Sequence, residues 1–178
     1  TGNDVILVSR ERLTLADGAT VLGTGSGPVD DLLLGDPAVA GSGDGTLLRA
    51  SGSAGGSIAR RGVSNSILPQ MTVGAGATIG GGSIVLDSTY GTRLDPLAVL
   101  NAGEIALNSG QITIALQNAG VIAPTAGLVL AGPALDSIQS SARVFSLLSY
   151  SSLDLYGTGS LGSLAAFDSL TLSASTIR

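Results

Sequence analysis

The stretch LNAGEIALNSGQITIALQNAGVI, residues 100–122, repeats one small pattern three times. An Asn-Ala-Gly or Asn-Ser-Gly triplet begins at Asn101, Asn108 and Asn118, and each triplet leads into a short apolar run. Asn bonds its own backbone in turns, and Gly supplies positive φ without a steric penalty. The stretch therefore predicts short strands that are separated by tight turns.

Pairs of apolar residues separated by one position recur along the whole chain. Alternate residues of a strand share one face, so each pair predicts two side chains that point into a core. From residue 84 onward the pairs follow one another at steps of 21, 23, 25 and 17 residues. Helix signals are poor, and residues 137–148 are the best candidate for a helix. The chain is therefore predicted to be all-β, with strands at Leu13/Leu15, Leu32/Leu34, Met71/Val73, Ile84/Leu86, Ile105/Leu107, Leu128/Leu130, Leu153/Leu155 and Leu170/Leu172.

Two all-β architectures can use such strands. An antiparallel β-sandwich would close hairpins at the Asn-Ser-Gly turns. A right-handed parallel β-helix, a solenoid of about 20 residues per coil, would stack like residues on like in successive coils. The near-repeat of LTLADGATVLG at Leu13 and MTVGAGATIGG at Met71 favours the solenoid. We therefore predict one β-helical segment over residues 1–178, less regular over residues 1–66.

The last unit of the sequence, LTLSASTIR from Leu170, stops while the strand pattern is still running. An uncapped end of a solenoid would invite pairing with another strand. The sequence therefore predicts a fragment of a longer solenoid.

Composition limits the classes of function. Hydrophobic residues make up 44% of the 178 residues but aromatic residues only 3%, so the core of this single predicted domain is aliphatic. The net charge is −5 and all 8 basic residues are Arg, without a basic stripe, which argues against binding to nucleic acid. The absence of Cys excludes disulfides, thiolate metal sites and thiol catalysis.

The sequence shows neither a signal peptide nor a membrane-spanning segment. The first residues, with acidic Asp4 before the apolar run, do not resemble a signal peptide. Residues 105–135 lack charge, but Asn, Gln, Gly and Pro punctuate them and their period is near 2. No transmembrane segment is predicted.

Residues 146–178, SLLSYSSLDLYGTGSLGSLAAFDSLTLSASTIR, are the most familiar part of the chain. Together with GLVLAGPAL at residues 127–135 and the Asn-Ala/Ser-Gly triplets, they resemble the β-helical stalks of large bacterial exoproteins of the filamentous haemagglutinin family. The resemblance is best over residues 71–178. The Asn-Pro-Asn-Gly type secretion signature of the family is absent from the sequence, and no catalytic or ligand residue is carried over.

The resemblance implies a secreted protein of the bacterial cell surface. It implies two-partner secretion through an outer-membrane transporter, followed by display as a fibre that serves adhesion, aggregation or presentation of a toxin. The expected partner is a protein or glycan on a host or neighbouring cell. An autotransporter passenger segment is a further alternative, with a different export route.

Candidate chemistry rests on few residues. Asp30, Asp31 and Asp36 form the densest carboxylate group, and a polysaccharide-active β-helix enzyme would use such a pair as acid and base. The alternative interpretation, a solvated loop, is favoured because the chain has no His and no Lys. Calcium at Asp30, Asp31 or Asp44 is conceivable from the oxygen ligands alone. We predict no enzyme, no cofactor and no metal site.

Two other features have both a functional and a structural interpretation. Gly157-Thr158-Gly159-Ser160-Leu161-Gly162 matches the GxGxxG pattern of dinucleotide sites, but no room remains for the acidic residue such a site needs, so a turn is favoured. Gly80-Gly81-Gly82 is predicted to form a turn as well. The three Tyr residues are candidates for contact sites or for packing at corners: Tyr90, Tyr150 and Tyr156.

Overall fold

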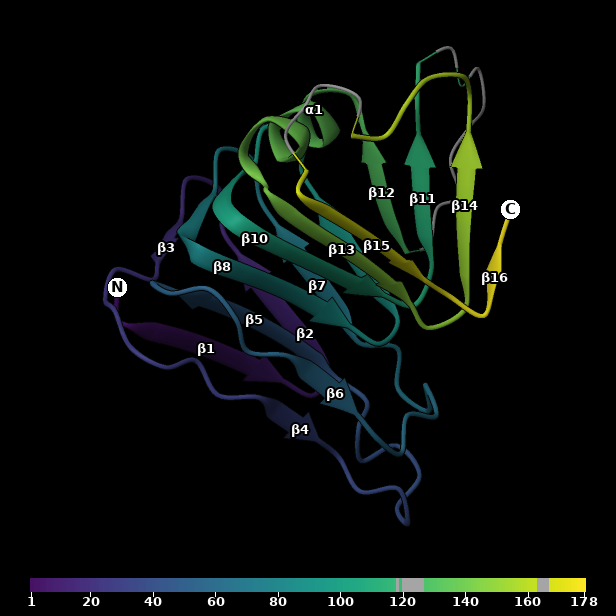
Figure 1. Cartoon of the computed structure of the whole chain (residues 1–178). Coiled ribbons are helices and arrows are strands. Elements are labelled where there is room, and N and C mark those ends of the chain that lie inside the picture. The colour runs from purple at the N-terminus through teal and green to yellow at the C-terminus, as the bar shows by residue number, and fades with distance from the viewer. Residues whose placement is uncertain (118, 120–126, 163–166) are drawn as a thin grey trace.

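The computed structural model describes residues 1–117, 119, 127–162 and 167–178, and these are arranged as β-strands with one short helix (Figure 1). The strands are β1 (Asp4–Ser9), β2 (Arg12–Leu15), β3 (Thr20–Leu22), β4 (Leu32–Leu34), β5 (Thr46–Ser51), β6 (Ile58–Arg60), β7 (Gln70–Val73), β8 (Thr78–Ser88), β9 (Gly91–Leu94), β10 (Val99–Ser109), β11 (Ile112–Ala115), β12 (Leu128–Ala131), β13 (Val144–Ser149), β14 (Ser152–Tyr156), β15 (Ser169–Ser173) and β16 (Thr176–Ile177). The helix is α1 (Gly132–Ser141). The predicted all-β class is confirmed, and each predicted apolar pair lies in a strand.

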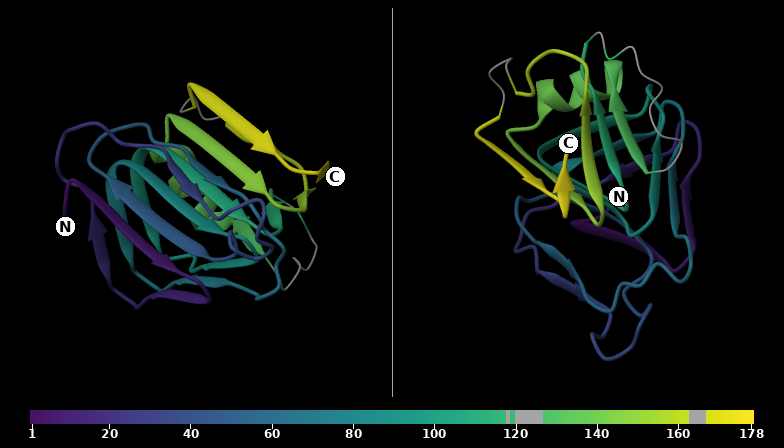
Figure 2. Two further views of the ribbon diagram at one scale, coloured as in Figure 1. Left: turned by 90° about the horizontal axis from the view of Figure 1, so that it is seen from below. Right: turned by 90° about the vertical axis from the view of Figure 1, so that its right-hand side faces the viewer.

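A seven-stranded mixed sheet, here called the main sheet, organises the molecule. Its order is β1-β5-β8-β10-β13-β15, and β3 also pairs with β8. β5 runs antiparallel to both β1 and β8, whereas β8, β10, β13 and β15 are parallel to one another. Seen from below, β1 in purple and the green and yellow strands β13 and β15 lie on opposite sides (Figure 2).

Three smaller sheets accompany the main sheet, and all their ladders are parallel. They have the orders β12-β11-β14-β16, β2-β7-β9 and β4-β6. β2 and β7 lie behind the main sheet, and β11, β12 and β14 lie beside it (Figure 1). One aliphatic cluster fills the space that these elements share, and it includes Leu15, Met71, Leu107, Ile114 and Leu153.

The predicted right-handed parallel β-helix over residues 1–178 is wrong. The antiparallel ladders on both sides of β5 and the division into one mixed sheet and several small sheets overturn it. The alternative antiparallel sandwich is wrong too, because the remaining ladders are parallel. The physical reason is that alternating apolar residues record which side chains face inward, and this pattern is the same for a parallel and an antiparallel partner.

Segments of similar sequence do pair with each other in two of the parallel ladders. LTL at Leu13 pairs with MTV at Met71 in the parallel β2–β7 ladder, and Thr20 pairs with Thr78 in β3–β8 at the same offset. In the main sheet Ile84, Ile105 and Phe145 lie across from one another. The repeat therefore specifies register between particular strands, although it does not specify one uniform coil.

Several residues that were predicted to form turns, and part of the helix candidate, lie in strands instead. Asn101-Ala102-Gly103 and Gly80-Gly81-Gly82 lie inside the long strands β10 and β8 rather than in turns. Asn108 and Ser109 end β10 before a bend, as the pattern predicts, and Asn118 and Gly120 of the third triplet lie outside the described residues. The helix begins at Gly132 with Pro133 in its first turn, and residues 144–148 of the helix candidate 137–148 lie in β13 instead. β-Branched Val and the alternating Phe and Leu of that stretch favour a strand.

Two segments on either side of β5, the first excursion (residues 23–45) and the second excursion (residues 52–69), carry β4 and β6. They place this pair over the outer face of the main sheet, the face that points away from the core. Leu48 and Ala50 of β5 face the core, so Arg49 points outward, and its Nη1 donates to the Asp30 carbonyl before β4. Arg60 of β6 reaches Asp87 of β8 from the same side. The excursions thus cover the outer face over β5 and part of β8, and the outer face over β10, β13 and β15 stays open.

Candidate functional site

The open part of the outer face forms a groove of about 490 Å³, here called the outer groove. Its floor consists of residues that alternate with core residues on four neighbouring strands of the main sheet. Hydroxyl and amide groups on the floor come from Ser83, Asn108, Ser146, Thr171 and Ser173, and aliphatic groups come from Val85, Ala106, Val144 and Leu148. The outer groove can therefore offer both hydrogen bonds and apolar contact to a ligand.

One wall of the outer groove is residues 55–58, the loop before β6 and the first residue of β6. Glu104 of β10 fixes this wall, because its Oε2 accepts a hydrogen bond of 2.8 Å from the Gly55 N–H. Gly56 has a φ of +81°, and a Cβ there would lie 2.7 Å from Arg49 Nη1, so the position requires Gly. Glu104 thus holds the wall to the main sheet at Gly55.

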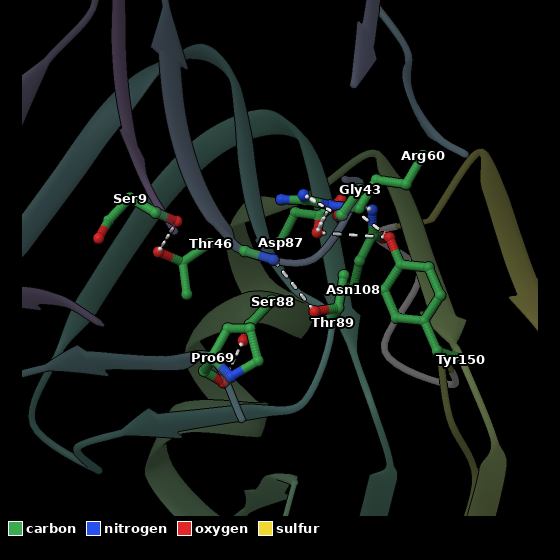
Figure 3. A network of polar contacts seen from close by, with 11 residues as sticks. Ser9, Gly43, Thr46, Arg60, Pro69, Asp87, Ser88, Thr89, Asn108 and Tyr150 are labelled. Carbon is green, nitrogen blue, oxygen red and sulfur yellow. Dashed lines mark hydrogen bonds and ion pairs between the residues drawn. The ribbon is translucent and has the colours of Figure 1, made fainter. Parts of the chain in front are cut away.

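A buried polar cluster adjoins the outer groove at Asn108 and is centred on Asp87 of β8 (Figure 3). Asp87 Oδ1 accepts a bond of 2.7 Å from Arg60 Nε, and Oδ2 accepts one of 3.0 Å from Asn108 Nδ2. The Tyr150 hydroxyl donates to the same carboxylate at 3.1 Å. Arg60 Nη1 donates to the Gly43 carbonyl at 2.7 Å. The cluster joins β6, β8, β10 and the turn after β13.

The environment of Tyr150 argues against acid–base work in this cluster. Burial raises the pKa of the Tyr150 phenol, and the negative charge of Asp87 raises it further. A phenol that stays protonated can donate a hydrogen bond but cannot act as a general base near neutral pH. Side chains of Asp87 and Arg60 are almost fully buried, so a substrate has no access to them. The cluster is a structural clasp.

A second ion pair joins β1 and β5. Arg49 is buried, and its Nε and Nη2 donate to the Asp4 carboxylate at 3.0 and 2.7 Å. The hydrogen bond from Arg49 lowers the pKa of Asp4, against the opposing effect of burial. Since the Asp4 side chain is 27% exposed, this ion pair lies at the surface end of a buried guanidinium.

The three aspartates considered for catalysis, Asp30, Asp31 and Asp36, each make a separate structural contact in or from the first excursion. Asp31 Oδ1 accepts bonds of 2.7 and 2.8 Å from the Ser57 backbone N–H and hydroxyl, and these bonds lower its pKa. Asp36 Oδ1 accepts the Ala38 N–H at 2.9 Å and so stabilises its own turn. Asp30 contributes its backbone carbonyl to Arg49. Within the described residues no hydrogen bond joins any two of these side chains.

Asp44, considered above for calcium, lies in the first excursion just before β5 and bonds to the second excursion. It accepts the backbone N–H groups of Ser64, Asn65 and Ser66 at 2.9 to 3.0 Å. Burial alone would raise the pKa of Asp44, but these donors outweigh burial and hold the pKa below its ordinary value. Asn65 has a φ of +53°, which Asn tolerates better than most residues. Asp44 thus shapes residues 64–66, and its oxygens are already occupied.

The glycine pattern at residues 157–162 follows β14, as the sequence predicts. The Thr158 N–H donates to the Gln117 carbonyl at 2.9 Å, and Gly157 and Gly162 have φ of +89° and +80°. The bond to Gln117 belongs to an isolated antiparallel bridge, and the positive φ values of the two glycines are typical of turns. The residues that directly follow, 163–166, lie outside the described part of the chain.

Metal and membrane sites find no positive support in the described residues. No group of three or more metal-ligating side chains occurs among them. In the same part of the chain, no helix has both the length and the apolar character needed to span a bilayer.

Sequence reasoning missed the residues that line the outer groove. Ser83, Glu104 and Ser146 alternate with the apolar pairs on which the strand assignment depends, so the pattern predicts that they face outward. The pattern does not tell which outward residues are covered by an excursion. Asp87 and Tyr150, 63 positions apart, carried no signal of proximity in the sequence.

The fold is thus that of an all-β protein with an open groove on a mixed sheet. Comparisons with protein-family models, with curated proteins and with solved structures give no match for this chain.

Proposed function

We propose that this chain is an adhesive structural segment of a secreted bacterial surface protein, and that the outer groove binds a partner on a host or neighbouring cell. The resemblance of residues 71–178 to the filamentous haemagglutinin family supports the location and supports export through an outer-membrane transporter. Substitutions in the outer groove can test whether it binds this partner.

The observation that carries the proposal is the chemistry of the outer groove. Among its lining residues in the described part of the chain, Glu104 is the sole charged side chain, and it is engaged with Gly55. Hydrolysis of a polysaccharide uses two carboxyl groups that flank the scissile bond. A groove with one engaged carboxylate, several hydroxyls and aliphatic side chains is suited to binding rather than to hydrolysis.

The same lining favours a protein ligand over a glycan. Val144 and Leu148 offer aliphatic contact, whereas no aromatic ring lines the groove in the described residues. Hydroxyl groups can rotate to donate or to accept, which suits the peptide groups and side chains of an extended segment. The preferred partner is therefore a polypeptide exposed on a cell surface.

Binding of the purified chain to cultured epithelial cells and to bacterial cells tests the proposal. Ser146 lies on the floor of the outer groove, and Ser146→Arg is expected to fill the groove and reduce bound protein at least tenfold. Leu97→Arg is the matched control, because Leu97 is 67% exposed and outside the groove; it is expected to bind normally. Thermal unfolding of both variants checks that they are folded.

Treatment of the cells separates the classes of partner. Protease treatment is expected to abolish binding, and glycosidase treatment is expected to leave it intact; the reverse result would identify a glycan. Equal binding by Ser146→Arg and the native chain would refute a role of the groove. Release of sugar from polysaccharides, lost in Asp31→Asn, would contradict the proposal and support the enzyme alternative.

A further inference from the structure

β1 is an exposed apolar strand at the edge of the main sheet. Its sequence is DVILVS, and Ile6 and Val8 are 40% and 61% exposed. β1 pairs with β5 on one side, and within the described residues no second strand pairs with it on the other side. Such an edge presents free N–H and C=O groups to another chain.

The register of β1 fixes which residues turn their backbone groups outward. Asp4 lies across from Ser51, so Asn3 lies across from Gly52, and the Gly52 N–H donates to the Asn3 carbonyl at 2.8 Å. Partners in an antiparallel ladder exchange bonds at every second residue. The odd-numbered residues of β1 therefore bond β5, and the even-numbered residues direct their N–H and C=O groups to the free edge.

The free edge lacks the features by which monomeric proteins usually avoid edge pairing. Such edges carry Lys, Pro or a bulge, or are covered by another element. Residues 5–8 are four consecutive apolar residues, three of them β-branched, without any of these features. This strand is therefore suited to pairing with another strand.

The charges at the two ends of β1 complement each other when the strand meets itself. Asp4 precedes the apolar run and Arg10 follows it, and both are exposed. Outward-directed residues can bond only to outward-directed residues, so an antiparallel pair of β1 strands must join even-numbered positions. The register centred on Leu7 satisfies this rule and places Asp4 of each copy across from Arg10 of the other. Asp4 Oδ2 accepts one bond, from Arg49 Nη2, and retains capacity for a second.

We infer that β1 binds antiparallel to β1 of a second copy of this chain, centred on Leu7, so that the two main sheets become one. The interface is isologous, with each strand presenting the same surface to its partner. Backbone hydrogen bonds at Ile6 and Val8 and two Asp4–Arg10 ion pairs hold the register.

A cysteine scan tests this dimer, because the native chain contains no Cys. In the proposed register the two Leu7 residues form a non-hydrogen-bonded pair with Cα atoms about 4.5 Å apart. That separation permits a disulfide. Leu7→Cys is therefore expected to form a covalent dimer on mild oxidation.

Two matched variants keep this test specific. In Val5→Cys the two Cys residues would be offset by about 14 Å along the strands, too far for a disulfide. Leu97→Cys places an equally accessible thiol away from β1. Both variants are expected to stay monomeric under denaturing conditions. Cross-linking of Val5→Cys to the same extent as Leu7→Cys would refute the register.

Sedimentation of the unmodified chain completes the experiment. The native chain and Leu97→Lys are expected to sediment as dimers at micromolar concentration, and Val8→Lys is expected to sediment as a monomer because two Lys residues would enter the interface. Val8 is largely exposed, so its substitution leaves the monomer folded. A native chain that is monomeric at all concentrations, with no selective Leu7→Cys cross-link, would overturn the inference.

Discussion

Asp87 connects parts of the chain that are far apart in the sequence. Its carboxylate accepts hydrogen bonds from Arg60 in β6, Asn108 in β10 and Tyr150 in the turn after β13. A buried ion pair contributes little to stability compared with an apolar pair of the same shape, but removal of one partner leaves an uncompensated buried charge. The side chains of Arg60 and Asp87 are 3% and 0% exposed, so this penalty applies here in full.

Asp87→Asn is therefore expected to lower the free energy of unfolding by about 3–5 kcal/mol, because the Arg60 guanidinium loses its counter-charge. Urea unfolding monitored by circular dichroism measures the change. Asp136→Asn is the control, since Asp136 is exposed on α1, and its effect is expected to stay within about 0.5 kcal/mol. A loss below about 1 kcal/mol in Asp87→Asn would mean that the ion pair does not bear on stability.

At the scale of elements, β8 changes its partner along one edge. Thr78–Gly80 pair in parallel with β3, and Ser83–Ser88 pair antiparallel with β5 on the same side. The change occurs at Gly80-Gly81-Gly82, where a Cβ on Gly81 would collide with the Ser51 carbonyl. Glycine inside a strand commonly marks such a close approach of two backbones. The glycine triplet thus allows one strand to join two ladders.

Gly81→Ala is expected to destabilise the fold by about 1–3 kcal/mol, because the added methyl group forces β5 away from β8. Gly103→Ala is the matched control on β10, where the nearest atom to a new Cβ, the Gly82 carbonyl oxygen, would be 3.7 Å away. Chemical unfolding of both variants measures the difference. Equal midpoints for the two variants would show that β5 approaches β8 less closely than described.

The positions of the strands could be predicted from the sequence, but their directions and partners could not. Apolar pairs such as Ile84/Leu86 predict strands correctly, since alternate burial is a local property. The direction of β5 and its pairing were not predictable, because antiparallel and parallel partners require the same alternation. The groove residues Ser83 and Glu104 were not predictable either. Their exposure depends on where the excursions end, and loops lack a periodic signal.

At the scale of the whole molecule, several carboxylates make stability depend on pH. Asp4 has a lowered pKa through its bond from Arg49, and Asp44 has one because its backbone donors outweigh burial. Asp154 likewise has a lowered pKa, because bonds from Gln111 and Arg178 outweigh burial. A carboxyl group with a lowered folded-state pKa stabilises the fold above its ordinary pKa, and this contribution is lost as pH falls through the folded-state value.

The free energy of unfolding is therefore expected to be nearly constant from neutral pH to about pH 5 and to fall as pH drops below about 4. Tyr150 affects the free energy of unfolding at alkaline pH, because its pKa in the folded state is raised above the ordinary 10.0. Its contribution is complete below pH 10.0 and is lost as pH rises above that value. Urea titrations between acid and alkaline pH measure both limbs, and Tyr150→Phe is expected to flatten the alkaline limb alone. An acid limb that is flat to pH 3 would contradict the expectation for the carboxylates.

The Asp87 clasp also has a consequence for the order of folding. The partners of Asp87 lie 27, 21 and 63 positions away, and the Arg49–Asp4 pair spans 45 positions. Proteins dominated by such non-local contacts fold slowly, because loop closure must precede the contacts that reward it. During synthesis from the N-terminus, Arg60 and Asp87 are both present before Tyr150 has been added to the chain. Among the contacts to the Asp87 carboxylate, the hydrogen bond from Tyr150 is therefore the last that can form during synthesis, after those from Arg60 and Asn108.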